Sequence, residues 1–191
     1  QNRDRVAFTL SEVPESNFVR GRDVAGAVIR EWQETFNVPR NTPTVVPLIL
    51  RRLGGALPTG YYHLAWADPP WGTQSLVFAV VDRHLTLKLA AEEALVWVTD
   101  LRSGEPISRT AVHLVDGGGV LVAAGTTDED GLARIPISLR EDLWVNVAAV
   151  VGEPGAKGFG VALTLWMGEA APSAFGVALD GSVTSPFVLR V

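Results

Sequence analysis

Short strand signals alternate with turn signals at regular spacing over residues 95–137 of this chain. The strand signals are short runs of apolar or alternating residues, at residues 96–99, 111–115, 120–124 and 132–137. The turn signals are Gly-containing pairs and triplets at residues 103–104, 117–119 and 130–131. Short strands closed by turns of this kind are typical of antiparallel β-sandwiches. The segment therefore predicts an all-β chain.

The composition is that of a globular chain. Of its 191 residues, 47% are hydrophobic and 19% are charged, unlike the polar and highly charged composition of disordered chains. The length suits one large domain or two domains of about 90–100 residues. No apolar run reaches the ~18–20 residues that a membrane helix needs, so we predict no membrane span. The chain has no cysteine, which excludes disulfides, zinc–thiolate sites and cysteine nucleophiles.

Charge is distributed unevenly along the chain. Residues 1–82 contain eight arginines and eight acidic residues, whereas residues 83–191 contain eight basic and thirteen acidic residues. Nucleic-acid binding needs clustered basic residues that displace counterions, so the acidic second half argues against a nucleic-acid partner. The chain begins at Gln1 without an apolar signal segment, and we expect a fragment from which targeting information has been removed.

Residues 1–82 contain a first set of strand signals. Apolar residues alternate over residues 5–13, a period of two that indicates a half-buried strand. Residues 26–38 fit either a helix or a strand, and the prolines that follow favour the strand. Further strands are predicted at residues 44–50 and in a hairpin that pairs residues 61–66 with residues 75–81.

Two domains, residues 1–82 and residues 83–191, are predicted to dock end to end. The apolar runs 75–81 and 85–89 are separated by three residues, which span at most roughly 10–11 Å. The second domain continues with predicted strands at residues 143–151, 159–166, 174–179 and 185–191. We expect each domain to be an antiparallel β-sandwich of about seven strands.

The residues show no reaction chemistry, so we predict that the chain is not an enzyme and uses no cofactor. Asp128 and Asp130 with Gly131 resemble a calcium loop, but the third acidic position and the distal Glu of an EF-hand are missing. We predict a hairpin turn there and no metal site, and we assign turn roles also to Gly104 and Pro106.

Histidines and tryptophans are the other candidates for function. The histidines fall on different predicted strands without a Ser or acid at a diagnostic spacing, and we expect sheet or surface positions: His63, His84 and His113. Five of the six tryptophans lie in predicted strands, where aromatic residues usually fill cores. Trp71 lies in a Pro-Pro-Trp-Gly turn and is the predicted contact residue for a partner or a neighbouring domain.

Several segments resemble one known family. They are VTDLRSGEPISRTAVHL (98–114), GVLVAAGTTDEDGLARIPI (119–137), LWVNVAAVVG (143–152), LPTGYYHLAWA (57–67), SLVFAVVDRHLTLKL (75–89) and APSAFGVAL (171–179). Together they are similar to macroglobulin-like domains of bacterial alpha-2-macroglobulins, whose fold is of the immunoglobulin or fibronectin-III type. The G-x-P…T-D-x-D-G-x-A pattern also occurs in carboxypeptidase regulatory-like and bacterial Ig-like surface domains.

The resemblance implies a function that belongs to a larger molecule. In that family a protease cleaves a bait segment, the macroglobulin domains collapse around it, and many members then bond to it through a Cys-Gln thioester. A chain without cysteine contains no thioester, so the resemblance implies a structural scaffold fragment of a protease inhibitor. It also implies an extracytoplasmic location (periplasm, cell envelope or secreted), neighbouring macroglobulin domains as partners, and contact with target proteases only through the full-length protein.

Two other functions stay open. The chain would also suit an Ig-like spacer or adhesin module of a bacterial surface protein. A carbohydrate-binding sandwich would need a planar row of exposed aromatic residues, for which Trp71 is the only plausible start.

Overall fold

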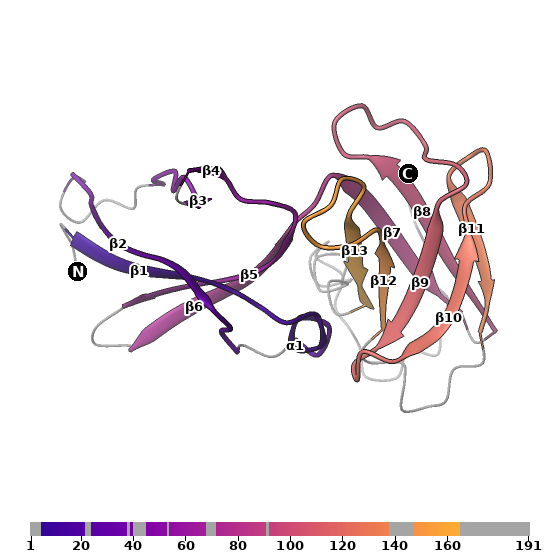
Figure 1. Cartoon of the computed structure of the whole chain (residues 1–191), viewed down its shortest axis with the longest axis horizontal. Helices are drawn as coiled ribbons and strands as arrows, with labels where there is room; N and C mark the ends of the chain where they lie inside the picture. The colour runs from indigo at the N-terminus through magenta and orange to yellow at the C-terminus, as the bar shows by residue number, and fades with distance from the viewer. Residues whose placement is uncertain are drawn as a thin grey trace, which may run out of the picture.

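The computed structural model describes residues 5–21, 24–37, 39, 45–52, 54–67, 72–90, 92–137 and 147–164. Apart from one short helix, all its regular structure is β. Figure 1 shows two parts side by side, connected where β6 passes into β7. The elements of the first part are β1 (Arg5–Glu12), α1 (Glu15–Val19), β2 (Val28–Thr35), β3 (Arg51–Arg52), β4 (Gly55–Ala56), β5 (Gly60–Ala67) and β6 (Thr73–Val80). Those of the second part are β7 (Arg83–Leu89), β8 (Glu93–Asp100), β9 (Ala111–Asp116), β10 (Leu121–Thr126), β11 (Leu132–Pro136), β12 (Val147–Val151) and β13 (Gly160–Leu163).

A four-stranded antiparallel sheet with the order β2-β1-β5-β6 forms the first part. Phe8 of β1 lies opposite Trp32 of β2 and Trp66 of β5, and its ring stacks on Trp32 with the centroids 5.2 Å apart. Leu10 is fully buried beside its partner Leu64. The predicted strand at residues 5–13, the strand interpretation of residues 26–38 and the hairpin of residues 61–81 are thereby confirmed.

The predicted strand at residues 44–50 is wrong. Residues 45–50 have no strand structure, and Thr44 lies outside the described residues. Pro47 has no N–H to donate to a neighbouring strand, so it disfavours a paired strand at this position. Val45 is 98% exposed and Ile49 66% exposed, so these apolar side chains do not contribute to a core.

The helix α1 was not expected from the sequence. It begins after Pro14, whose fixed φ suits a helix start, and its Phe18 and Val19 are buried. A helix of five residues is too short to show the helical spacing of apolar residues that a sequence pattern needs.

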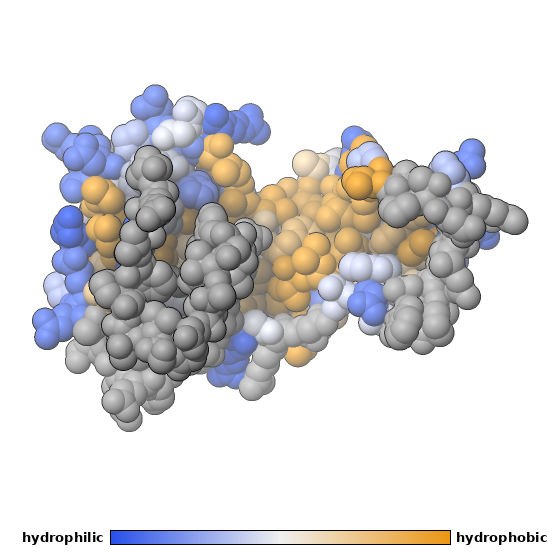
Figure 2. Space-filling model, turned by 180° about the vertical axis from the view of Figure 1, so that it is seen from behind, coloured by the Kyte–Doolittle hydropathy of each residue, from blue (hydrophilic) through white to orange (hydrophobic). Residues whose placement is uncertain are grey.

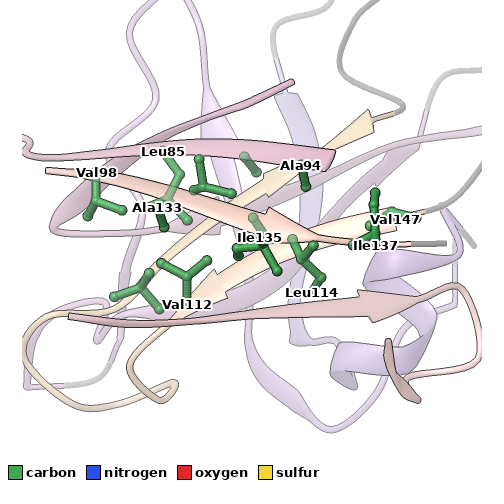
Figure 3. Close-up of a cluster of buried hydrophobic side chains, with 13 residues drawn as sticks. Leu85, Ala94, Val98, Val112, Leu114, Ala133, Ile135, Ile137 and Val147 are labelled. Carbon is green, nitrogen blue, oxygen red and sulfur yellow. The ribbon is translucent and has the colours of Figure 1, made fainter. Parts of the chain in front are cut away.

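The second part is a sandwich of two antiparallel sheets. One sheet has the order β10-β9-β12-β13 and the other β11-β8-β7. Their facing side chains form the sandwich core, in which Val96, Val98, Val112 and Leu114 are fully buried (Figure 3). The all-β sandwich fold class is confirmed. The structure describes seven strands in this part and six in the first part. The predicted strands at residues 174–179 and 185–191 lie outside the described residues.

Candidate functional site at the junction of the two parts

The strand β12 has buried residues at every position, unlike a strand with one solvated face. Val147, Ala149 and Val151 point into the sandwich core, whereas Ala148 and Val150 belong to a second buried cluster. Successive side chains of a strand point to opposite faces, so the sheet β10-β9-β12-β13 is covered on both sides at β12. The first part of the chain provides the second cover.

The second cluster, called here the junction cluster, joins residues that are far apart in the sequence. Its members from the first part are Val13, Phe18, Val19 and Tyr61, and those from the second part are Val115, Ala148, Val150, Phe159, Val161 and Leu163. Tyr61 lies between two aromatic rings, with centroids 4.5 Å from Phe18 and 5.3 Å from Phe159. The Tyr61–Phe159 pair is edge-to-face, an arrangement that aromatic rings favour.

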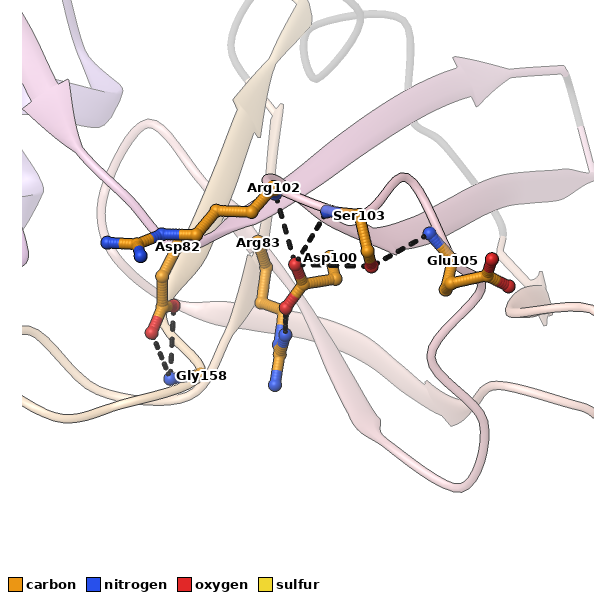
Figure 4. Close-up of polar contacts among 7 residues, drawn as sticks. All are labelled: Asp82, Arg83, Asp100, Arg102, Ser103, Glu105 and Gly158. Atoms are coloured by element: carbon orange, nitrogen blue, oxygen red, sulfur yellow. Dashed lines mark hydrogen bonds and ion pairs between the residues drawn. The ribbon is translucent and has the colours of Figure 1, made fainter.

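Asp82 attaches the connection between the parts to the β12–β13 turn. Its carboxylate oxygens accept hydrogen bonds from the Gly158 N–H at 2.8 and 3.0 Å (Figure 4). The backbone N–H groups of Asp82 and Arg83 both donate to the Phe159 carbonyl at 3.0 Å. Only Val81 and Asp82 lie between β6 and β7. These hydrogen bonds therefore fix the connecting segment to the β12–β13 turn of the second part.

Close approach of β13 to β7 depends on Gly160. A Cβ at this position would lie 2.5 Å from the Leu85 Cδ1 atom and 2.8 Å from the Arg83 carbonyl oxygen. A side chain larger than hydrogen would therefore push the two strands apart next to the connection.

Arg83 also forms an ion pair with Asp100 at the end of β8. The Asp100 carboxylate accepts hydrogen bonds from the backbone N–H groups of Ser103 at 3.1 Å and Arg102 at 3.0 Å (Figure 4). These backbone donors, followed by Arg83, lower the pKa of Asp100 below its usual value. The ionised carboxylate thus organises the turn after β8 and holds the first residue of β7.

The Tyr61 hydroxyl is buried without a hydrogen-bond partner. Burial, and secondarily the Glu15 carboxylate, raises the pKa of Tyr61 far above its usual value. An unpartnered buried hydroxyl costs free energy that the same group does not lose in water. The Tyr61 hydroxyl therefore disfavours contact between the two parts, whereas the apolar side chains of the junction cluster favour it.

Polar contacts surround the junction cluster. The Gly155 N–H donates to the Thr59 carbonyl at 2.7 Å, and the Thr59 hydroxyl donates to the Ala156 carbonyl at 2.9 Å. Arg20 donates through Nε to the Gly117 carbonyl on the other side. Beside Thr59 lies an open cleft of about 340 Å³, lined mostly by the first part, including Glu12, Glu15 and Arg52, and bordered by Pro154 of the second part.

The residues assigned to turns by the sequence lie in the β8–β9 and β10–β11 connections, at the end of the sandwich where Arg83 pairs with Asp100. The Asp128 carboxylate accepts hydrogen bonds from the Asp130 N–H at 3.0 Å and the Leu132 N–H at 2.9 Å. Gly131 has φ +74°, and a Cβ there would lie 2.6 Å from the Val98 carbonyl oxygen. Gly104 has φ +75° in an open turn, and Pro106 forms an isolated bridge with Thr99.

The structure does not bring the other candidate residues together. His63, His84 and His113 lie on β5, β7 and β9, and His63 is buried whereas the other two are exposed. Within the described ranges, no three His, Cys, Asp or Glu side chains are grouped as a metal site requires. Whether Asp128 and Asp130 bind calcium stays a prediction.

The tryptophan predictions have different outcomes. Trp71 lies outside the described residues, as do Trp144 and Trp166. Trp97 was expected in a core, but it is 43% exposed and donates from its indole N–H to the Asp130 carbonyl at 3.1 Å. It points away from the core because Val96 and Val98, its neighbours on β8, occupy the inner face.

The sequence did not predict the contacts of the junction cluster. Their pairing joins segments about 100 residues apart, such as Tyr61 and Phe159, which no local pattern encodes. One signal was available: the uninterrupted apolar run at residues 147–151 indicates a strand covered on both faces.

Comparisons with known proteins agree with this architecture. Residues 80–180 match the family model of the bacterial alpha-2-macroglobulin MG3 domain. Over 81 residues the chain is 36% identical to the alpha-2-macroglobulin of Ralstonia nicotianae, an alignment that covers 42% of this chain and 5% of that protein. The chain therefore spans a small part of the length of this relative.

Two solved structures of native alpha-2-macroglobulin from Escherichia coli share the fold. The one spanning domains NIE-MG1 has a TM-score of 0.66 at 12% identity and covers 85% of this chain and 84% of that chain. The one spanning MG0-NIE-MG1 has a TM-score of 0.62 at 16% identity, with 83% and 55% covered. No described helix is long and apolar enough to cross a membrane. With the family model matching residues 80–180, this chain belongs to the bacterial alpha-2-macroglobulin family.

Proposed function

We propose that the chain is a structural, non-catalytic scaffold fragment of an extracytoplasmic alpha-2-macroglobulin-like protease inhibitor. Its two domains, residues 1–82 and 83–191, hold neighbouring macroglobulin domains of the parent protein at a set angle. Target proteases meet it only within the full-length protein. The observation that carries the proposal is the junction cluster, because a buried apolar interface between two sheets restricts their relative motion.

The contacts at the junction are those of a structural joint. The side chains of the junction cluster are apolar apart from the Tyr61 hydroxyl. The cluster therefore offers surfaces for packing and few side chains that could act as an acid, a base or a nucleophile. Asp82 adds directional hydrogen bonds to Gly158 at the point where the chain crosses between the parts. Packing resists separation of the two parts, and the directional bonds resist their rotation.

The first experiment tests whether the fragment inhibits proteases by itself. Trypsin, elastase and subtilisin are incubated with the chain, and their activity on a large protein substrate is measured. We expect full activity, because trapping in this family belongs to the whole molecule. A small chromogenic substrate serves as the control for direct active-site inhibition. Stoichiometric protection of the large substrate would contradict the scaffold proposal.

The second experiment tests the rigidity of the joint. Small-angle scattering is compared between the wild type and a variant with Gly-Ser inserted between Val81 and Asp82, which leaves Asp82 bound to the second part. We expect a narrow distribution of dimensions for the wild type and a broader one for the variant. The same insertion between Glu129 and Asp130, in the exposed turn after β10, is the matched control. Equally broad distributions for wild type and variant would show a free hinge.

A further inference from the structure

An exposed apolar segment of the first part, residues 45–52, is called here the arm. Its sequence is VVPLILRR. Residues 45–50 lie outside every strand and helix, and Arg51 and Arg52 form the short strand β3. This strand pairs with β4 in a two-stranded sheet of its own, and Figure 1 shows β3 and β4 apart from the four-stranded sheet. Strand pairing therefore does not hold the arm in the sheet of the first part.

The apolar side chains of the arm face solvent. Val45 is 98% exposed, Ile49 66% and Val46 41%. A side chain exposed to the extent of Val45 has no protein surface on any side. A Cβ on Gly54 or Gly55, just beyond the arm, would meet no atom within 4 Å, so the β3–β4 hairpin also lies next to open space. Exposed apolar side chains that lie close together mark a site of interaction.

The arm lies in a stretch of the sequence without acidic residues. Residues 35–67 contain three arginines and no aspartate or glutamate, whereas the whole chain has a net charge of −5. Arg51 and Arg52 are exposed, and neither forms an ion pair with a described residue. Arg52 borders the cleft that contains Glu12 and Glu15. In Figure 2, hydrophobic and hydrophilic side chains lie side by side at the upper edge of the first part, where Figure 1 places β3 and β4. The arm is thus apolar and cationic on a chain that is acidic overall.

We propose that the arm binds the surface of a bilayer that contains anionic lipids. The apolar side chains of residues 45–50 enter the interfacial region, and Arg51 and Arg52 contact the lipid phosphates. Apolar groups beside basic residues are the combination that holds peripheral segments at such a surface, and guanidinium groups bind phosphate through paired hydrogen bonds. This contact is additional to the scaffold role proposed above and does not depend on it.

The backbone of the arm favours a lipid surface over a protein groove. Residues 45–50 form no strand, and Pro47 has no N–H, so the segment is poorly suited to pairing with a partner strand. The segment is not helical either, so it presents no apolar helix face. Its exposed side chains include those of the consecutive residues Val45 and Val46. A fluid interface accepts apolar groups that point in several directions, whereas a protein interface needs a matched shape.

The first test measures binding of the whole chain to vesicles by flotation at low ionic strength. We expect binding to an equal mixture of phosphatidylcholine and phosphatidylglycerol, and much weaker binding to phosphatidylcholine alone. Arg51→Gln combined with Arg52→Gln should lower the partition coefficient by about tenfold or more, because each basic residue near an anionic surface contributes roughly fivefold. Arg5→Gln combined with Arg102→Gln is the matched control, because it changes the net charge equally at exposed positions outside the arm. It is expected to bind nearly as the wild type does.

The second test removes apolar side chains from the arm without changing its charge. Val45→Ser combined with Ile49→Ser should lower the partition coefficient by about tenfold, because less apolar surface enters the bilayer. Val120→Ser combined with Leu121→Ser is the matched control, since these two side chains are 62% and 57% exposed in the second part. All four side chains are exposed, so we expect both variants to keep the melting temperature of the wild type.

The third test uses the absence of cysteine in the chain. Val45→Cys can carry a single nitrobenzoxadiazole (NBD) label, whose emission shifts to shorter wavelength in an apolar environment. We expect this shift on mixed vesicles, together with quenching by nitroxide-labelled lipids. The same label on Leu121→Cys is expected to show neither change.

Five results would reject the proposal. The wild type would not bind mixed vesicles at any lipid concentration, or the arm variants would bind as well as their controls, or the label at residue 45 would stay unshifted on a bound chain. Concentration-dependent dimerisation without lipid, abolished by Val45→Ser with Ile49→Ser, would assign the arm to a second copy. In the full-length parent protein, a label at residue 45 shielded from iodide without lipid would assign the arm to a neighbouring domain.

Discussion

The two parts of the chain bury their strands in different ways. The second part closes a core between its own two sheets, with Val96, Val112 and Leu114 fully buried inside it. In the first part, Val13, Phe18, Val19 and Tyr61 belong to the junction cluster and are buried partly by residues of the second part. The comparison indicates that the second part is the more independent folding unit and that the first part depends on the junction.

The largest expected effect comes from Phe159→Ala, which removes a fully buried ring from the junction cluster. Deleting a buried aromatic side chain costs ~3–5 kcal/mol of unfolding free energy. We expect this loss in chemical denaturation, together with faster hydrogen exchange in β5 of the first part, because Tyr61 loses its edge-to-face partner.

The matched control for Phe159→Ala is Ile135→Ala in the sandwich core. Ile135 is 1% exposed and belongs to the core of the second part alone. Its truncation is expected to cost ~2–5 kcal/mol without a selective increase of exchange in β5. If both variants loosened β5 equally, the two parts would form one cooperative unit and the contrast between them would fail.

A smaller effect is expected from Gly131→Ala, in a turn of the second part. The substitution combines a φ of +74° with a Cβ only 2.6 Å from the Val98 carbonyl oxygen. Overpacking of this kind costs ~1–3 kcal/mol, in addition to ~1 kcal/mol for the left-handed conformation. Gly104→Ala is the control, because its φ is +75° but nothing lies within 4 Å of its Cβ. Equal melting temperatures for the two variants would show that the turn relaxes without cost.

Tyr61→Phe is expected to stabilise the protein by ~1 kcal/mol, because it removes an unpartnered buried hydroxyl and keeps the ring contacts. The pH dependence provides a second measurement. The pKa of Tyr61 is raised in the folded state above its ordinary value of 10.0. Its ionisation therefore leaves the free energy of unfolding unchanged well below pH 10 and lowers it as the pH rises above 10, because the unfolded chain loses the proton first. The variant should lose less stability between pH 9 and 11. An unchanged alkaline profile would show that the hydroxyl is hydrated.

The sequence predicted the strands better than their contacts. Alternation located β1, the β5–β6 hairpin and most strands of the sandwich, because an apolar period of two reports which face of a strand is buried. It failed at residues 45–50, where apolar residues stand beside Pro47 and remain exposed, and at α1, which is too short to show a period. The junction was missed because burial of Tyr61 depends on Phe159, which is distant in the sequence.

The smallest expected effect concerns Asp100, which belongs to the second part and contacts Arg83 beside the connection. Backbone hydrogen bonds from Ser103 and Arg102, and then Arg83, lower the pKa of Asp100 in the folded state below its ordinary value of 3.8. The carboxylate therefore stabilises the fold above pH 3.8, and this contribution is lost as the pH falls through the folded-state pKa. Asp100→Asn should slightly reduce the loss of stability at acid pH, and the effect is small because the Asp100 side chain is 30% exposed.

Asp116→Asn is the control, because Asp116 also accepts backbone hydrogen bonds in a turn but has no arginine partner among the described contacts. If Asp100→Asn alone broadened the scattering distribution at neutral pH, the ion pair would help to set the angle of the joint, and the division between a self-contained second part and a dependent first part would need to include this turn.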